Sequence, residues 1–323
     1  MNIYPWQIEQ WQQTVRRYRQ GSLPHSLLLM GMPGLGKLEF ASQFSRSLFC
    51  EQVDDQGQAC GQCKTCLLLD AGTHPDFHLI EPEENSKVIK IDQIRKLCDV
   101  MGRKAQLGGY RVAIISPAEC MNTNAANSLL KTLEEPGSMT MIMLVSSQAG
   151  LLPATIRSRC QRLEFNRPPT DVSINWLEKQ SVTGDIGLLL DLSQKTPLQA
   201  LSAYRQGYLE ERESFVNEFL GLKQGLQNPL QLADKWNKLR PDSCLQWMMS
   251  WVMDLIRMKA QADTSQITNR DIKHHLQPIA EQLDLLNMYA FLDKLQVASR
   301  QLTTQVNGQL LLEDVFISWI KIR

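Results

Sequence analysis

The stretch SLLLMGMPGLGK, residues 26–37, decides the fold. Its first five residues form an apolar run that predicts a buried parallel strand, and the next seven match the G-x-x-x-x-G-K pattern of a phosphate-binding loop. A helix over residues 38–49 is expected to follow. Backbone N–H groups of such a loop approach phosphate oxygens, and the lysine adds a positive charge. The candidate nucleotide-binding residues are therefore Gly31, Gly34, Gly36 and Lys37.

The loop lacks the groups that usually hold magnesium. The residue after the lysine should carry a hydroxyl, but here it is Leu38. The strand expected at 111–115 should end in acidic residues, but Ser116 and Pro117 follow it, and Glu119 lies farther along. We therefore expect no ATP hydrolysis, no Mg²⁺ and doubtful nucleotide binding. Weak, magnesium-independent nucleotide binding and a turn that binds nothing both remain open.

Hydrophobic periodicity divides the chain of 323 residues into three regions. Residues 1–166 alternate strands with helices, which predicts an α/β domain with a parallel sheet covered on both faces. The expected elements are strands at 26–30, 77–80, 111–115, 141–145 and 162–165, and helices at 38–49, 91–101 and 124–135. Short amphipathic helices at 170–180 and within 186–205 predict a small helical domain over residues 167–208. Long helical patterns fill residues 209–323, where we expect the four tryptophans to pack in a core: Trp236, Trp247, Trp251 and Trp319.

The composition limits the classes of function. Hydrophobic residues make up 43% and charged residues 21% of the chain, which is typical of a globular protein. Lysine plus arginine and aspartate plus glutamate number 34 each, so no global charge drives nucleic-acid binding. The first 20 residues do not resemble a signal peptide, and no run of 18 apolar residues could span a membrane. We expect a cytoplasmic protein without a membrane partner.

Four of the eight cysteines cluster with the spacing C-x9-C-x2-C-x2-C: Cys50, Cys60, Cys63 and Cys66. In a reducing compartment such a cluster predicts a metal site. Four thiolates with no open position suit structural Zn²⁺ in an insert over residues 50–66. A redox or disulfide cluster and an iron–sulfur cluster are the competing interpretations.

Arg159 lies in Ser158-Arg159-Cys160, directly before the last expected strand. An arginine on a loop at the edge of a domain can reach into a neighbour's ATP site and stabilise charge on the transferred phosphoryl group. The alternative is a surface arginine in a local salt bridge. Position alone favours that alternative, because most exposed arginines are merely solvated.

Several motifs resemble the AAA+ clamp-loader subunits of bacterial DNA polymerase III. They are NSLLKTLEEP at 127–136, Ser158-Arg159-Cys160, the four-cysteine insert, YPW at 4–6 and GTHPD at 72–76. The resemblance implies an AAA+ P-loop domain over 1–166, a helical lid over 167–208 and an oligomerising collar over 209–323. It also implies a heteropentameric ring with delta and tau/gamma subunits, which loads a sliding clamp on primer-template DNA.

The missing magnesium residues point, within this family, to a stator subunit that does not hydrolyse ATP but supplies Arg159 in trans as an arginine finger. The resemblance further places Leu198 where working subunits offer an arginine to their own nucleotide, and Ser146 and Ser147 where they sense the γ-phosphate. Two other functions remain possible. They are an active ATP-hydrolysing motor subunit, against which Leu38 and Pro117 speak, and a stand-alone zinc-containing DNA-binding protein, against which the neutral charge speaks.

Overall fold

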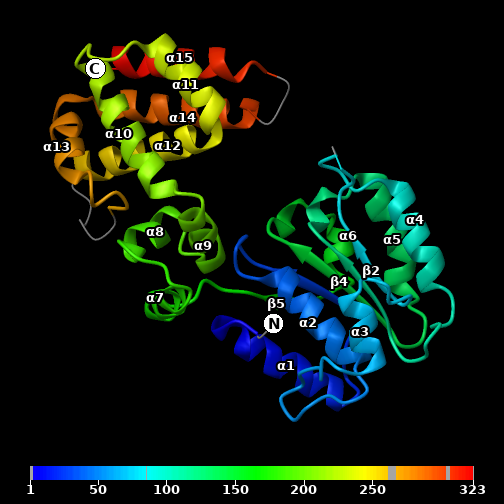
Figure 1. Ribbon diagram of the computed structural model, residues 1–323. Helices are drawn as coiled ribbons and strands as arrows, with labels where there is room; N and C mark the ends of the chain where they lie inside the picture. The colour runs from blue at the N-terminus through cyan, green and yellow to red at the C-terminus, as the bar shows by residue number, and fades with distance from the viewer. Residues whose placement is uncertain (1–2, 85, 261–266, 303–305, 323) are drawn as a thin grey trace. The chain divides into compact units, whose positions relative to one another are not determined.

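A computed structural model describes residues 3–84, 86–260, 267–302 and 306–322 (Figure 1). The contacts between Cα atoms divide the chain into two compact units. The first contains residues 1–176 and 196–199, and the second contains residues 177–195 and 200–323. The boundary passes through the expected lid, so the division into three domains at 167–208 and 209–323 stays a prediction. Residues 261–266, 303–305 and 323 of the expected collar lie outside the described residues.

The first unit is an α/β domain. Its strands are β1 (Ser26–Met30), β2 (Phe77–Ile80), β3 (Arg111–Ile115), β4 (Thr140–Ser146) and β5 (Gln161–Glu164). Its α-helices are α1 (Ile8–Arg19), α2 (Lys37–Phe49), α3 (Lys64–Asp70), α4 (Ile91–Met101), α5 (Thr123–Glu134) and α6 (Ala154–Arg157). Helix α7 (Thr170–Lys179) begins in this unit, and its last three residues belong to the second. Its 3-10 helices are η1 (Pro5–Gln7), η2 (Ala118–Cys120) and η3 (Ala149–Leu151).

The five strands form one parallel sheet in the order β2-β3-β4-β1-β5. In register, Leu28 of β1 lies beside Leu144 of β4 and Arg162 of β5. Because every connection between parallel strands must cross over the sheet, helices cover both faces. The sheet that the sequence predicts is confirmed, and each expected strand agrees within one residue at either end.

Successive side chains of each strand enter two different cores, because a strand has a period of two. Met141 and Met143 of β4 pack with Phe40 and Phe44 of α2 on one face. Ile142 and Leu144 pack on the other face with residues of α4 and α5, and Figure 1 shows these two helices side by side there. The central strands β1, β3 and β4 are thus buried on both faces, which explains why they are continuous apolar runs.

The second unit is helical. Its helices are α8 (Ile186–Leu192), α9 (Pro197–Arg205), α10 (Tyr208–Lys223), α11 (Pro229–Leu239), α12 (Pro241–Lys259), α13 (Lys273–Gln282), α14 (Leu285–Leu302) and α15 (Gly308–Lys321). Residues 186–205 thus form two helices, α8 and α9, because Pro197 begins a new helix and cannot continue an old one. The first three residues of α9 belong by their contacts to the first unit.

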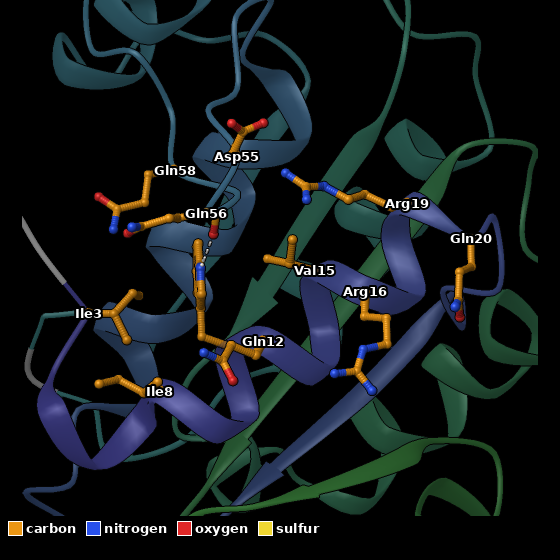
Figure 2. Close-up of a pocket in the computed structure, with 11 residues that line it drawn as sticks. Ile3, Ile8, Gln12, Val15, Arg16, Arg19, Gln20, Asp55, Gln56 and Gln58 are labelled. Carbon is orange, nitrogen blue, oxygen red and sulfur yellow. Dashed lines mark hydrogen bonds between the residues drawn. The ribbon is translucent and has the colours of Figure 1, made fainter.

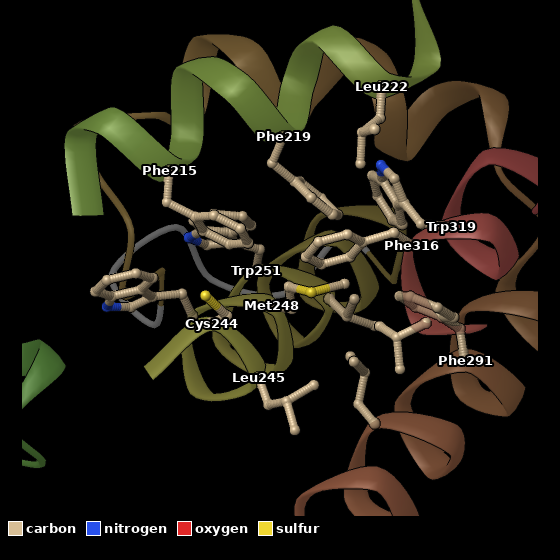
Figure 3. Packing of buried hydrophobic residues seen from close by; sticks show 14 of the residues in the cluster. Phe215, Phe219, Leu222, Cys244, Leu245, Met248, Trp251, Phe291, Phe316 and Trp319 are labelled. Atoms are coloured by element: carbon tan, nitrogen blue, oxygen red, sulfur yellow. The ribbon is translucent and has the colours of Figure 1, made fainter. Parts of the chain in front are cut away.

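An aromatic core holds the long helices of this unit together (Figure 3). Phe215 of α10 stacks on Trp251 of α12 with ring centroids 5.5 Å apart, and Phe219 stacks on Trp319 of α15 at 5.1 Å. All four expected core tryptophans are at most 3% exposed. The prediction that they pack in a core is confirmed.

Candidate functional site

The phosphate loop joins β1 to α2, as the sequence predicts. Gly34 and Gly36 have φ angles of 78° and 77°, which glycine adopts without the steric cost that other residues meet. Lys37 is the first residue of α2 and is 5% exposed. The loop therefore has the backbone turn and the lysine that a phosphate cradle requires.

Other parts of the chain fill the space in front of these glycines. A Cβ atom on Gly34 would lie 2.6 Å from Cγ of Gln199 and 3.0 Å from Oγ1 of Thr196, and the Gly34 carbonyl accepts a hydrogen bond from the Leu198 N–H at 3.2 Å. A Cβ atom on Gly36 would lie 2.5 Å from the Tyr4 ring. The loop that could cradle a phosphate is packed against its own chain.

The N-terminal segment holds the other side of the loop. Gln7, 1% exposed, donates hydrogen bonds to the carbonyls of Leu35 and Gly36 at 2.8 and 2.7 Å. The indole of Trp6 donates to the Leu35 carbonyl at 3.0 Å and stacks on Tyr4 with ring centroids 5.0 Å apart. The carbonyls of the loop are thus fixed by side chains from η1 and its flank.

The Lys37 ammonium is bound by protein groups. It donates to the carbonyls of Gly31 and Met32, both at 2.7 Å, and to Oγ of Ser147 at 3.2 Å. Burial lowers the pKa of Lys37 to about 8, while the nearby carboxylates of Glu119 and Glu39 act in the opposite direction. The ammonium that would bind a triphosphate is therefore already hydrogen-bonded to groups of the protein.

Magnesium ligands are not found at the expected positions. The Leu38 side chain packs against the hydrophobic cluster that lies between α2 and the sheet. At the end of β3, Ser116 is buried and precedes the exposed Pro117. Glu119 has its Oε1 bonded by the Ser147 N–H at 3.0 Å, so its carboxylate stands near Lys37. The return of Glu119 to the loop could not be predicted from the sequence, because this approach depends on the fold of η2 and on the end of β4.

The four clustered cysteines come together as the spacing predicts. Their sulfur atoms all lie within 4.8 Å of one another, so the four residues could bind a metal ion. Backbone N–H groups of Gln52 and Cys60 point to the Cys50 sulfur at 3.3 and 3.2 Å. Backbone N–H groups of Gln62 and Cys63 likewise point to the Cys60 sulfur, and they lower the pKa of the Cys60 thiol. Such donors favour the thiolate form that binds metals.

The insert that carries the cysteines is anchored to α1 and α2. Trp11 of α1 donates its indole N–H to the Gln56 carbonyl at 2.8 Å, and Ser47 of α2 donates to the Gly57 carbonyl at 2.6 Å. Figure 2 shows the pocket that remains between α1 and the insert, about 750 Å³ in volume. Arg16 and Arg19 line it from α1, and Asp55 lines it from the insert. The insert is thus attached to the domain on the face of the sheet that α1 and α2 cover.

Arg159 lies at the other end of β1 from the phosphate loop. Its Nε donates to Oε1 of Glu134 at 2.7 Å, its Nη2 forms an ion pair with the same oxygen, and its Nη1 donates to the Thr155 carbonyl at 2.9 Å. The side chain is 34% exposed. The local salt bridge that the alternative interpretation expects is therefore present, and the side chain also remains accessible from solvent.

Comparison with known proteins identifies the family. Family models described as "DNA polymerase III, delta subunit" and "DNA polymerase III, delta subunit, C terminal" match residues 6–169 and 206–321. The chain is 35% identical to DNA polymerase III subunit delta' of Pseudomonas aeruginosa, over 98% of this chain and 97% of that protein. The chain belongs to the delta-prime subunits of DNA polymerase III. The Escherichia coli delta-prime subunit is 30% identical over 98% and 95% of the two chains.

Membership of the delta-prime family confirms the expected role in DNA replication, as a subunit of the DNA polymerase III clamp loader. A solved structure, the DNA polymerase III gamma subunit-related protein of Thermotoga maritima, matches with a TM-score of 0.50 and 18% identity over 96% of this chain and 99% of that one. That likeness concerns the fold, and the expected AAA+ fold class with a helical C-terminal region is confirmed. Within the part of the delta-prime chain that the structure describes, no helix is long and apolar enough to cross a membrane.

Three groups at the candidate sites escaped sequence reasoning: Tyr4, Gln199 and Glu134. Tyr4 and Gln199 come from segments far from the phosphate loop in sequence. Glu134 stands in one of the motifs that indicated the family, but its contact with Arg159 joins residues 25 positions apart. A search for acidic residues in the motifs around the arginine could have suggested Glu134. The motif that contains Tyr4 did not indicate that its ring meets Gly36, and no motif indicated the contact of Gln199.

Proposed function

We propose that this delta-prime chain is the non-hydrolysing stator of its clamp loader and supplies Arg159 as an arginine finger to a neighbouring ATPase subunit. The observation that carries the proposal is the phosphate loop, in which Leu38 replaces the magnesium ligand and the chain's own Gln199 and Tyr4 face the glycines. A site of this kind lacks the magnesium ligands that phosphoryl transfer needs, and its glycines are packed against other parts of the chain. Catalysis in the assembly then depends on other subunits.

The same contacts favour a loop that binds no nucleotide over weak, magnesium-independent binding. A triphosphate would have to displace the carbonyls that hold Lys37 and the side chains that cover Gly34 and Gly36. Without magnesium, Lys37 would be the one residue of the loop itself that neutralises the charge of the phosphates. We therefore assign to the loop a structural role, in which its carbonyls attach η1 and the segment 196–199.

The purified chain is expected to show no magnesium-dependent ATP hydrolysis, and Lys37→Ala is expected to leave the clamp- and DNA-stimulated ATPase of the reconstituted complex unchanged. The reason is that Lys37 binds loop carbonyls rather than a phosphate. The release of phosphate is measured, and alanine substitution of the equivalent lysine in a tau/gamma subunit is the positive control. Turnover by the purified chain that Lys37→Ala abolishes would restore the motor interpretation.

We further propose that Cys50, Cys60, Cys63 and Cys66 hold one structural Zn²⁺. Four thiol donors, close together and with no oxygen or nitrogen ligand among them, suit a closed tetrahedral zinc site rather than a catalytic one. Such thiols stay reduced in the cytoplasm, where we place the protein. The ion would stabilise the turns of the insert and present Gln56 and Gly57 to α1 and α2.

The assembly that we propose is the heteropentameric ring with delta and tau/gamma subunits, which acts on the sliding clamp and on primer-template DNA. The helical unit offers a surface for association. Leu286, Tyr289 and Val297 lie on one face of α14 and are 77%, 49% and 44% exposed. Exposed apolar side chains grouped on one helix face are typical of a protein–protein interface.

Replacing Leu286 and Tyr289 together by aspartate is expected to weaken assembly with delta and tau/gamma by at least about tenfold, since burying two charges in an apolar interface is costly. Size-exclusion chromatography of the mixed subunits measures the result. Leu226→Asp, at a residue that is 74% exposed between α10 and α11, is the matched control. Assembly of the double variant at the wild-type concentration would exclude this face as an interface.

A further inference from the structure

Glu134 and Arg159 meet although different elements carry them. Glu134 is the last residue of α5, and Arg159 lies between α6 and β5. The carboxylate receives the Nε–H of the guanidinium at 2.7 Å and forms an ion pair with Nη2, so one edge of the guanidinium rests on Glu134. The contact fixes the direction of a side chain that would otherwise rotate about several bonds.

The main chain of Arg159 is held as well. Ser26, 1% exposed at the start of β1, donates its hydroxyl to the Arg159 carbonyl at 2.8 Å. The Arg159 N–H donates to the Ile156 carbonyl at 3.1 Å, and the next residue, Cys160, is buried. With the backbone fixed at both of its polar groups, only the side chain can change direction, and Glu134 restrains it.

The donors of Arg159 divide into two sets. A guanidinium has five N–H groups, and the contacts with Glu134 and Thr155 engage one on each of its three nitrogens. One N–H on each terminal nitrogen remains without a partner among the described residues. Arginine binds the oxygens of a phosphate through such N–H groups on its terminal nitrogens.

We infer that Glu134 is a positioning residue for Arg159: it holds one edge of the guanidinium and leaves the terminal donors for the phosphoryl group in a neighbouring subunit. This inference rests on the proposed trans role of Arg159. Stability gives no other reason for the pair, because both side chains are partly exposed, at 34% and 48%, and such surface ion pairs contribute little to folding. Orientation of a group before reaction is, in contrast, a large part of catalysis.

The test uses the complete clamp loader, reconstituted with variant chains and assayed with clamp and primed DNA. Glu134→Ala is expected to lower kcat at the site that Arg159 serves by about tenfold, with the KM for ATP nearly unchanged, because a misdirected guanidinium weakens the transition state more than the ground state. Glu134→Gln keeps an oxygen that can accept from Nε, so it is expected to recover most of the rate. Glu135→Ala is the matched control, since Glu135 is the adjacent exposed carboxylate and no contact with Arg159 is found for it among the described residues.

A double variant separates the inference from the proposal on which it rests. If Glu134 acts through Arg159, Glu134→Ala in an Arg159→Ala background lowers the rate no further. A rate that falls with Arg159→Ala but not with Glu134→Ala, or that rises with Glu134→Ala, overturns the positioning role alone. A rate unchanged by Arg159→Ala overturns both. A loss in Glu134→Ala that persists without Arg159, or a matching fall in Tm, would make Glu134 merely structural.

Discussion

Arg159→Ala is expected to lower ATP hydrolysis at the neighbouring site of the clamp loader by about 10³-fold or more while leaving assembly intact. An arginine finger stabilises charge that develops on the transferred phosphoryl group, and removing one costs about 10³–10⁵ in rate. In the ring that we propose, other subunits carry further ATP sites, so the expected result is a loss of hydrolysis equal to the share of one site. Rapid-quench measurement of the first turnover with clamp and primed DNA resolves that share.

Arg162→Ala is the matched control for this prediction, because Arg162 is an exposed arginine three residues farther along, on β5. Arg159→Lys is expected to remain strongly impaired, since a lysine keeps the charge but cannot grip two oxygens at once. A first turnover of wild-type amplitude and rate with Arg159→Ala would show that the contacts with Glu134 and Thr155 are all that this arginine does.

Cys66→Ser is expected to reduce the zinc content from about one ion per chain to nearly none and to lower Tm by roughly 10 °C. The Cys66 side chain is fully buried in the cluster, so the site cannot replace it from solvent. Losing a structural metal is among the changes that cost about 4 kcal/mol or more. In a domain of this size, each kcal/mol lowers Tm by about 2–4 °C.

Native mass spectrometry and differential scanning calorimetry measure these two quantities. Cys120→Ser, a cysteine-to-serine change outside the cluster, should retain both the metal and the melting temperature. Limited proteolysis should cut Cys66→Ser within residues 50–66 and leave the sheet intact. Iron with visible absorbance would support the iron–sulfur interpretation, and zinc retained in Cys66→Ser would show that the four thiols are not its ligands.

The sequence predicts most of the α/β domain because its strands are local signals. The three central strands, β1, β3 and β4, are short apolar runs beside turns, and burial on both faces of a parallel sheet requires such runs. The cysteine cluster was also predictable, since the spacing of Cys60, Cys63 and Cys66 brings three sulfurs together within one turn and the start of α3. These features depend on residues that are near one another along the chain.

The contacts that decide how each site works are long-range and could not be predicted in the same way. Gln199 reaches Gly34 from 165 positions away, and Ser147 brings Glu119 toward Lys37 only because β4 and η2 end side by side. Helix α1 was not predicted, because the first 20 residues were considered only as a possible signal peptide. Trp11 and Val15 of this helix pack against α2 and the insert. Helix α1 is what closes the domain over the cysteine insert.

Strand β1 lies between Arg159 and the phosphate loop. It begins at Ser26, which holds the backbone of Arg159, and ends at Met30, next to the phosphate loop. Five residues of strand extend only about 17 Å. Arg159 and the phosphate loop therefore lie at opposite ends of one short strand. Because Tyr4 and Gln199 pack against the loop, the subunit that we propose would supply an arginine to one neighbour and would not itself need an arginine from another. Such a subunit would stand at one end of a row of ATPase subunits.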